Sequence, residues 1–288
     1  MGSSCLSIVS LSSRFLHRTI TAAGLSSQTV EIDGDTTIHF WSPPVATSKP
    51  QLVFIHGFGP QSIWQWRQQI SFCVGEFDVY VPDLVFFGDS FTKTADRSEV
   101  SQATCIAKLL GKLGIRLYSL VGTSYGGFVA YRLAAMWPER VQKVVIAVST
   151  VNMRLADNDE LLKKANVEKI EDLLMSLTAS HLRKLLGSAV FRRPYIPDFV
   201  LNDCIGKLYS ENRKDKLELL QGLTMNGDDI SPLSQHDQIF LLEKAFELKR
   251  LVGEKARLEV IRNAAHVPQL ENAGQFNDII KNFLHGFS

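Results

Sequence analysis

The chain of 288 residues contains the stretch LYSLVGTSYGG at residues 117–127. Leu117–Val121 predicts a strand, and the residues from Tyr125 onward predict a helix. The turn between them has the pattern Gly-x-Ser-x-Gly, in which the glycines leave room for a very tight backbone. Such a turn lifts the Ser124 hydroxyl above the edge of a sheet, beside a helix N-terminus. Ser124 is therefore a candidate nucleophile; the alternative is an ordinary strand–loop–helix turn with a capping serine.

Further strands are predicted on both sides of this turn. Alternating residues at Thr29–Ile32 and Thr36–Trp41 predict an antiparallel hairpin, and Leu52–Ile55, Phe77–Val81 and Val144–Val148 predict buried strands separated by helical segments. Strands that alternate with helices at this pitch indicate a doubly wound, mostly parallel sheet with helices on both faces.

The pattern changes after Thr150. Up to about residue 224 the chain is helical and amphipathic, and then a helix (Leu241–Arg250), a strand (Leu258–Ile261) and a C-terminal helix around Phe276–Leu284 follow. A helical block inserted late in a parallel sheet lies as a cap over the carboxyl ends of the strands, where open α/β sheets bind ligands. We therefore expect an α/β core at 29–150 and 225–288, a helical cap at 151–224 and an N-terminal extension at 1–28.

The N-terminal extension is rich in serine, carries Arg14 and Arg18, and has no acidic residue before Glu31. That composition is typical of a transit peptide, which would direct the protein to a chloroplast or mitochondrion. Its apolar residues could equally line one face of a helix that lies on the domain, and this is the interpretation we favour, with a cytoplasmic location.

The overall composition is that of a soluble globular protein with a net charge of +1, so we expect no nucleic-acid partner and a monomer or weak dimer. No apolar run is long enough to span a bilayer. The four cysteines are scattered, which predicts free thiols in a reducing compartment and no metal site.

A serine nucleophile needs a base within hydrogen-bond reach. Of the seven histidines, His266 follows the late strand Leu258–Ile261, so its ring is expected over the sheet edge near Ser124, in the order Ser before His. His56 ends the strand Leu52–Ile55 but precedes a glycine turn, His56-Gly57-Phe58-Gly59. That turn is predicted to aim the backbone N–H of Phe58 at a developing oxyanion, with the N–H of Tyr125 as the second donor.

Together these motifs resemble the α/β-hydrolase superfamily over residues 29 to the end. The resemblance rests on Phe54–Gly57, on Pro82-Asp83-Leu84 with Gly88 and Ser90, on Gly122–Gly127 and on His266 followed by Glu271. Within the superfamily the chain is most similar to plant monoacylglycerol-lipase-like enzymes, and more distantly to carbon–carbon hydrolases of ring-cleavage products. The resemblance implies ester or related acyl hydrolysis without metal or cofactor, and a structural role for Asp83.

This sequence differs from the family pattern at the acid of the Ser–His–Asp triad. Asp237 precedes a helix as the family acid does, but no apolar strand precedes Asp237, and Pro232 does not suit a central strand. Asp228 and Asp229 are alternatives. If the strand is missing, the flanking strands either pair directly, which would move His266 sideways, or leave a gap beside the core. Two functions therefore remain: a working serine hydrolase, or a catalytically impaired relative, such as a ligand-binding sensor or a shortened isoform.

The cap is rich in apolar residues, most of which serve to hold it on the core. The remainder, with Trp64, Trp66 and Tyr125 near the oxyanion turn, could line a pocket for a lipophilic acyl chain. A small lipophilic ester is the expected substrate.

Overall fold

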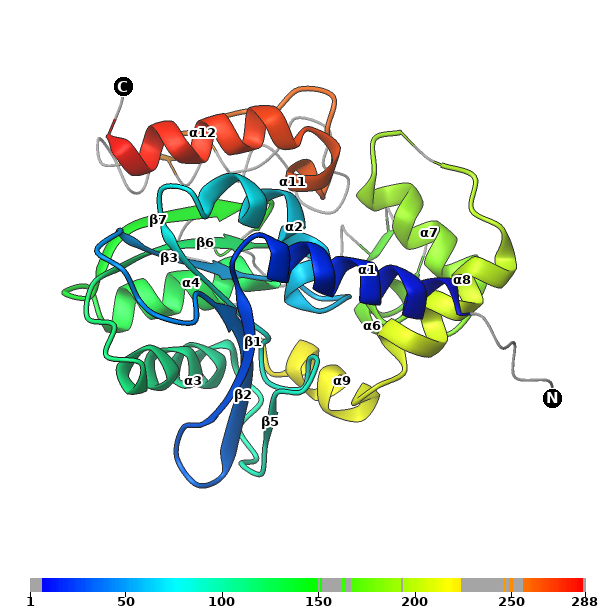
Figure 1. The fold of residues 1–288 in the computed structure, drawn as a ribbon. Helices are drawn as coiled ribbons and strands as arrows, with labels where there is room; N and C mark the ends of the chain where they lie inside the picture. Colours follow the sequence, from blue (N-terminus) through cyan, green and yellow to red (C-terminus); the bar gives the residue numbers. More distant parts are fainter. Residues whose placement is uncertain are drawn as a thin grey trace.

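A computed structural model of the protein describes residues 7–149, 151, 162–163, 167–192, 194–223, 246, 249–250 and 256–286. In these residues a mixed sheet of seven strands has the order β1-β2-β4-β3-β6-β7, with β5 paired to β2 (Figure 1). The strands are β1 (Ser26–Glu31), β2 (Thr36–Ser42), β3 (Gln51–Ile55), β4 (Asp78–Pro82), β5 (Phe91–Thr92), β6 (Tyr118–Thr123) and β7 (Val141–Ala147). β1 and β2 form the predicted antiparallel hairpin, and β4, β3, β6 and β7 are parallel. The α/β architecture predicted from the sequence is confirmed.

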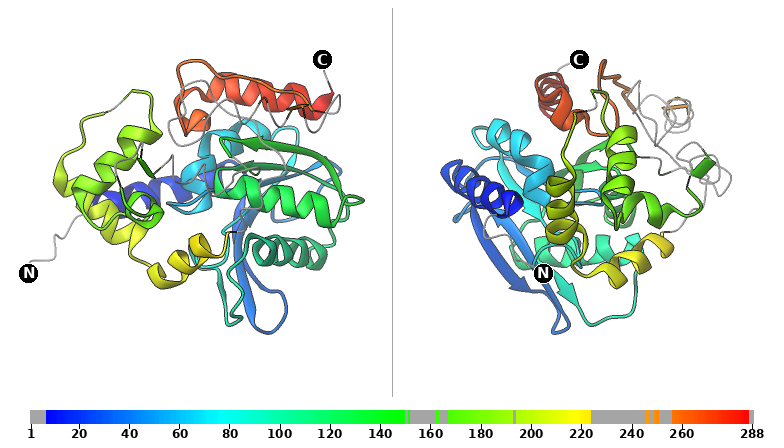
Figure 2. Two further views of the ribbon diagram at one scale, coloured as in Figure 1. Left: turned by 180° about the vertical axis from the view of Figure 1, so that it is seen from behind. Right: turned by 90° about the vertical axis from the view of Figure 1, so that its right-hand side faces the viewer.

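Helices cover both faces of the sheet (Figures 1 and 2). On one face lie α3 (Glu99–Lys112) and α4 (Tyr125–Met136), and on the other lie α2 (Ser62–Cys73), α11 (Pro268–Glu271) and α12 (Ala273–His285). The central strands β3, β4 and β6 between them are almost wholly buried; every residue of β4 and β6 is inaccessible to solvent or nearly so. This double burial explains why these strands read as continuous apolar runs.

A separate group of short helices lies beyond the carboxyl ends of the parallel strands. It consists of α6 (Ile170–Leu174), α7 (Ala179–Ala189), α8 (Asp198–Cys204), the π-helical turn η1 (Ile205–Tyr209) and α9 (Arg213–Gln221). Their buried side chains, among them Leu182, Leu201 and Tyr209, pack on Phe128 of α4. The apolar residues of this region therefore hold the helices on the core.

The N-terminal segment forms a 15-residue helix, α1 (Ile8–Ala22), which contacts α2 and α8. Leu16 and Ile20 are buried against the same apolar cluster as Trp66; Phe15, one of the apolar residues that were expected to line a single face, is exposed instead. The carboxylate of Asp203 in α8 accepts hydrogen bonds from the Ser7 hydroxyl and the Val9 backbone N–H, each at 2.9 Å. One helix end is thereby tied to the cap region.

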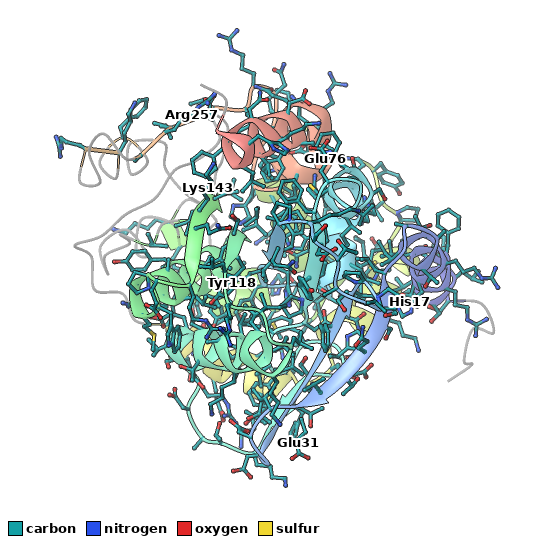
Figure 3. The ribbon with its side chains drawn as sticks, turned by 60° about the vertical axis from the view of Figure 1, so that its left-hand side comes forward. His17, Glu31, Glu76, Tyr118, Lys143 and Arg257 are labelled. Carbon is teal, nitrogen blue, oxygen red and sulfur yellow. The ribbon has the colours of Figure 1, made fainter. Side chains whose placement is uncertain are left out.

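The late strand predicted at Leu258–Ile261 is wrong: residues 256–261 have no strand conformation. Among the described residues nothing pairs with the outer edge of β7, and its residues are half-buried. A cavity of about 120 Å³ separates Val144–Val148 from Arg257, Glu259 and Ile261. Figure 3 labels Lys143 on β7 and Arg257 on the separate segment. Of the two expected consequences of a missing strand, the described residues have the gap and not the direct pairing.

Asp83 is held by a buried network at the end of β4. Its carboxylate accepts hydrogen bonds from the Ser62 backbone N–H and from His39 Nδ1, both at 2.8 Å, and Ser90 donates to its backbone oxygen at 2.7 Å. A side chain at Gly88 would lie 2.4 Å from the same carboxylate, and so only glycine fits there. These contacts join β2, β4 and α2 below the candidate site.

This network predicts a pH-dependent stability. Burial lowers the pKa of His39, but the hydrogen bond and charge of Asp83 outweigh burial and raise that pKa above the usual 6.5. Because the pKa is raised in the folded state, the stabilisation is fully present below pH 6.5 and is lost as the pH rises through the folded pKa. Urea unfolding of the wild type should therefore show a falling free energy of unfolding across this window. A His39→Gln variant with the same decline would contradict the assignment.

Candidate active site

Ser124 lies on a strained turn between β6 and α4. Its backbone angles are φ 52° and ψ −123°, a conformation that residues other than glycine rarely adopt. Its N–H donates to the Ala147 oxygen at 3.0 Å, and its own oxygen accepts from the Gly127 N–H at 2.9 Å. The predicted turn is thus present, with the serine side chain at the end of the sheet.

The glycines of the turn are required by close backbone approaches. A Cβ on Gly122 would lie 2.3 Å from the Gly126 oxygen, and a Cβ on Gly126 would lie 2.3 Å from the Ile55 oxygen. No side chain fits at these distances. The sharp turn therefore brings β6, α4 and the end of β3 together at one point.

The turn after β3 lies directly against Ser124. A Cβ on Gly57 would come within 2.8 Å of Ser124 Cβ and 3.5 Å of Ser124 Oγ. The described residues offer no hydrogen-bond acceptor for the backbone N–H of Phe58 or Tyr125, and the two aromatic rings pack edge to face at 4.9 Å. These two N–H groups, predicted as oxyanion donors, therefore have neighbouring backbone positions beside the serine.

Among the histidines that the structure describes, His266 reaches Ser124. Its Nε2 lies 3.1 Å from Ser124 Oγ, close enough for the hydroxyl to donate to an imidazole protonated at Nδ1. His266 is buried, with only 8% of its surface exposed, and its backbone N–H donates to the Ala189 oxygen of α7 at 2.9 Å. The gap beside β7 has not moved this histidine away from the serine.

Glu271 holds the loop that carries His266. Its carboxylate accepts the Ala265 N–H at 2.8 Å and, through the other oxygen, the Phe191 N–H at 2.7 Å. One side chain thereby joins the histidine loop to the segment after α7. The sequence singled out Glu271 as part of a resemblance but gave no reason for its presence; the reason is a contact between segments 80 residues apart.

Gln65 of α2 holds the turn before Phe58, and sequence reasoning missed it. Its Oε1 accepts the Gly57 N–H at 3.0 Å, and its Nε2 donates to the Gly57 and Pro60 oxygens at 3.0 and 2.9 Å. His56 adds a bond to the same oxygen. Since the Leu84 N–H donates to His56 Nε2 at 2.9 Å, the proton is on Nδ1, which donates to the Gly57 oxygen at 2.8 Å. Burial lowers the pKa of His56, which favours this neutral form.

Two other expectations have clear outcomes. Trp66 does not line a pocket: it is fully buried and packs on Phe54 with ring centroids 4.9 Å apart. Cys73 and Cys105 are free and buried as expected, and burial raises the pKa of the Cys73 thiol to about 12 and that of Cys105 to about 11. Such thiols are inert at neutral pH, so neither is a competing nucleophile.

The predicted triad acid, Asp237, lies outside the described residues, as do the alternatives Asp228 and Asp229. Within the described ranges, no group of three or more His, Cys, Asp or Glu side chains could hold a metal ion. No helix in that part of the chain has the length and apolar character that crossing a membrane requires.

Both the sequence and the fold are similar to those of known hydrolases. The sequence is 25% identical to a 2-hydroxy-6-oxononadienedioate/2-hydroxy-6-oxononatrienedioate hydrolase of Paraburkholderia phymatum, over 92% of this chain and 98% of the relative. The fold is similar to that of a bacterial membrane phospholipase A (TM-score 0.78, 22% identity, 97% of this chain and 92% of the other). It also resembles the carboxylesterase CesB of Bacillus subtilis (TM-score 0.70, 18% identity, 96% and 98%).

These relatives and structural neighbours are hydrolases, lipases and esterases among them. The sequence profile of the α/β hydrolase fold matches residues 50–204, which include β3, the serine turn and helices α6, α7 and α8. With the sheet order and the serine turn described above, this match establishes that the chain belongs to the α/β hydrolase fold family.

Proposed function

We propose that this chain is a serine hydrolase that cleaves lipophilic carboxylic esters, of the monoacylglycerol kind, through an acyl-enzyme on Ser124. The observation that carries the proposal is the 3.1 Å separation between His266 Nε2 and Ser124 Oγ at the end of a strained strand–helix turn. Strain at a serine is maintained only where the surrounding fold imposes it, and it keeps the hydroxyl exposed to a substrate.

The mechanism follows from the arrangement of donors around the serine. His266 accepts the hydroxyl proton as Ser124 Oγ attacks the ester carbonyl, and the resulting oxyanion is bound by the N–H groups of Phe58 and Tyr125. His266 then protonates the leaving alcohol. A water molecule, deprotonated by the same imidazole, attacks the acyl-enzyme; the bond between the acyl carbon and Ser124 Oγ breaks, His266 returns the proton to Oγ, and the carboxylic acid leaves. We assign Asp237 the task of holding the His266 tautomer.

A lipophilic acyl group is favoured by the apolar residues that the cap region directs at the core. Phe128, Leu182, Leu185, Leu201 and Tyr209 form one apolar cluster across the cap and α4. Tyr209 also approaches the turn that follows Phe58, since its hydroxyl lies 3.6 Å from where a Gly59 Cβ would be. An acyl chain entering beside Ser124 would meet this cluster.

A fluorophosphonate probe tests the proposal most directly. We expect stoichiometric labelling at Ser124, and turnover of p-nitrophenyl esters that increases from acetate to octanoate because longer chains bury more apolar surface. Absence of labelling in folded protein would favour the alternative, a catalytically impaired sensor.

A second candidate is hydrolysis of a carbon–carbon bond in an acidic ring-cleavage product, as the name of the Paraburkholderia relative describes. The observation that favours it is Lys216 of α9, which is 3% exposed and whose ammonium makes no hydrogen bond or ion pair with any described residue. Its ammonium lies 4.8 Å from the Phe87 ring centroid, and the Phe87 ring lies 5.2 Å from that of Phe58. A buried cation near the oxyanion turn could bind a substrate carboxylate.

Rates on a dienoate acid and on an ester distinguish carbon–carbon hydrolysis from ester hydrolysis. If the protein cleaves a 2-hydroxy-6-oxo-dienoate faster than octanoate esters, and a Lys216→Met variant raises KM for the acid alone, the carbon–carbon activity is the main one. If Lys216→Met leaves ester turnover unchanged and no dienoate is cleaved, the ester hydrolase stands.

Replacing Gln65 with alanine is expected to lower kcat and to leave substrate binding unchanged. Because the peptide bond is planar, fixing the Gly57 oxygen fixes the direction of the Phe58 N–H. Gln65→Ala should therefore lower kcat by roughly tenfold, since one oxyanion donor is worth about 10²–10³ and only its orientation is loosened. KM should stay nearly constant. The matched control is Gln68→Ala on the same helix, whose amide makes only a long 3.4 Å bond to Leu270; a similar loss of kcat in that variant would disprove a specific role.

A further inference from the structure

The N-terminal helix α1 has two apolar faces, and only one of them is buried. Val9, Leu16 and Ile20 pack on the core. Ile8, Leu11 and Phe15, spaced i, i+3 and i+7, share another face and are 43%, 50% and 73% exposed. An exposed phenylalanine alone is ordinary, but three large apolar side chains in line on one helix form a continuous strip.

Within α1 the charged side chains beside this strip are all positive; the Asp203 carboxylate of α8 lies at the start of the helix, where it bonds Ser7 and Val9. Arg14 and Arg18 are exposed on the same outer side of the helix, next to the strip, and no acidic residue occurs between Ser7 and Ala22. Apolar residues bordered by arginines, without compensating carboxylates, are typical of helices that lie in the interface of a membrane whose headgroups carry negative charge.

A further exposed aromatic side chain lies on α8, which contacts α1. Asp203 of α8 faces the start of α1, because its carboxylate bonds Ser7 and Val9. Phe199 lies four residues before Asp203 and hence on the same face of α8, and it is 66% exposed. In Figure 1 α1 runs across the front of the molecule to α8, and in Figure 3 the label His17 marks it at the outer flank.

We propose that Ile8, Leu11, Phe15 and Phe199, flanked by Arg14 and Arg18, form a docking surface for a lipid bilayer that contains anionic lipid. The helix is already folded and anchored to both core and cap, so docking requires little ordering. A bilayer bound here would lie beside the cap. This binding does not depend on the chemistry at Ser124, so its failure would leave the proposed hydrolysis untouched.

Vesicle co-sedimentation of the full chain tests the surface. We expect binding to vesicles of phosphatidylcholine with phosphatidylglycerol, and weaker binding to phosphatidylcholine alone. Leu11→Ser and Phe15→Ser should each weaken partitioning by about tenfold, and Arg14→Gln with Arg18→Gln by about tenfold or more on the anionic vesicles only. Melting temperature and fluorophosphonate labelling, measured on each variant, show that the fold is retained.

The matched controls are equally exposed residues elsewhere. Leu117 is 53% exposed and precedes β6, which is separated from β1 by three strands, so Leu117→Ser should bind vesicles as the wild type does. Lys214→Gln removes a similarly exposed charge from α9. Equal binding by Phe15→Ser and Leu117→Ser would overturn the proposal. So would absence of vesicle binding together with a dimer that Phe15→Ser dissociates, since the strip would then cover a second copy.

Discussion

Replacing Ser124 with alanine is expected to abolish labelling by fluorophosphonates and to reduce ester turnover by about 10⁴-fold or more. Removal of a triad nucleophile leaves only the rate acceleration that comes from oxyanion binding and substrate positioning. The hydroxyl contributes one hydrogen bond at 3.1 Å to His266 and no packing volume of consequence. The variant should therefore fold normally, with a melting temperature within a few degrees of the wild type.

The control for this variant is a second buried serine. Ser149 follows β7, is fully buried, and its hydroxyl makes no hydrogen bond with any described residue. Ser149→Ala should keep labelling and turnover at wild-type levels. If Ser124→Ala retains most of the activity, or if labelling disappears with Ser149→Ala instead, Ser124 is not the nucleophile.

Replacing Gly126 with alanine should have the largest effect on stability. The added Cβ would lie 2.3 Å from the Ile55 oxygen and 2.5 Å from the His56 oxygen, and both are backbone atoms at the end of the central strand β3. Neither can move without disturbing the sheet, so we expect a loss of at least about 3 kcal/mol in the free energy of unfolding. For a chain of this size that lowers the melting temperature by roughly 6–12 °C. Activity should fall as well, because the same strand end carries the turn with Phe58.

Gly274→Ala is the matched control. Gly274 lies in the first turn of α12, and nothing is within 4 Å of the position its Cβ would take. Alanine is a better helix former by about 0.5–1 kcal/mol, so this variant should be as stable as the wild type or slightly more so. Equal destabilisation by the two substitutions would show that the close approach at Gly126 is not the cause.

The hairpin and the central strands could be predicted because each is a local pattern. Alternation at 29–41 and apolar runs such as Leu52–Ile55 depend only on which faces of a strand are buried. The prediction of a strand at Leu258–Ile261 was wrong because it too rested on a local pattern alone. Four residues of suitable composition predict a strand, but a strand forms only where its backbone pairs with a neighbouring edge, and residues 256–261 lie across a cavity from the unpaired edge of β7.

The serine turn could be predicted from the sequence alone. Its glycines and its strand–helix context are contiguous, and the backbone approaches that require glycine occur wherever such a turn meets the end of β3. The order of Ser124 and His266 could be predicted in the same way, as could Phe58 and Tyr125 as donors. Each of these inferences uses residues that are close in sequence, or an order along the chain that the fold class fixes.

The distant groups that hold these residues in place become known only when the helices are packed against the sheet. Gln65 on the Gly57 turn, Glu271 between the His266 loop and Phe191, and Asp203 on the start of α1 join segments that are eight, 80 and 196 residues apart. A glutamine or carboxylate carries no local signal of its partner, because hydrogen bonds between distant segments depend on how helices pack against the sheet. The exposed face of α1 is likewise a tertiary result: its sequence is apolar on two sides, and packing on α2 and α8 selected the side that remains in solvent.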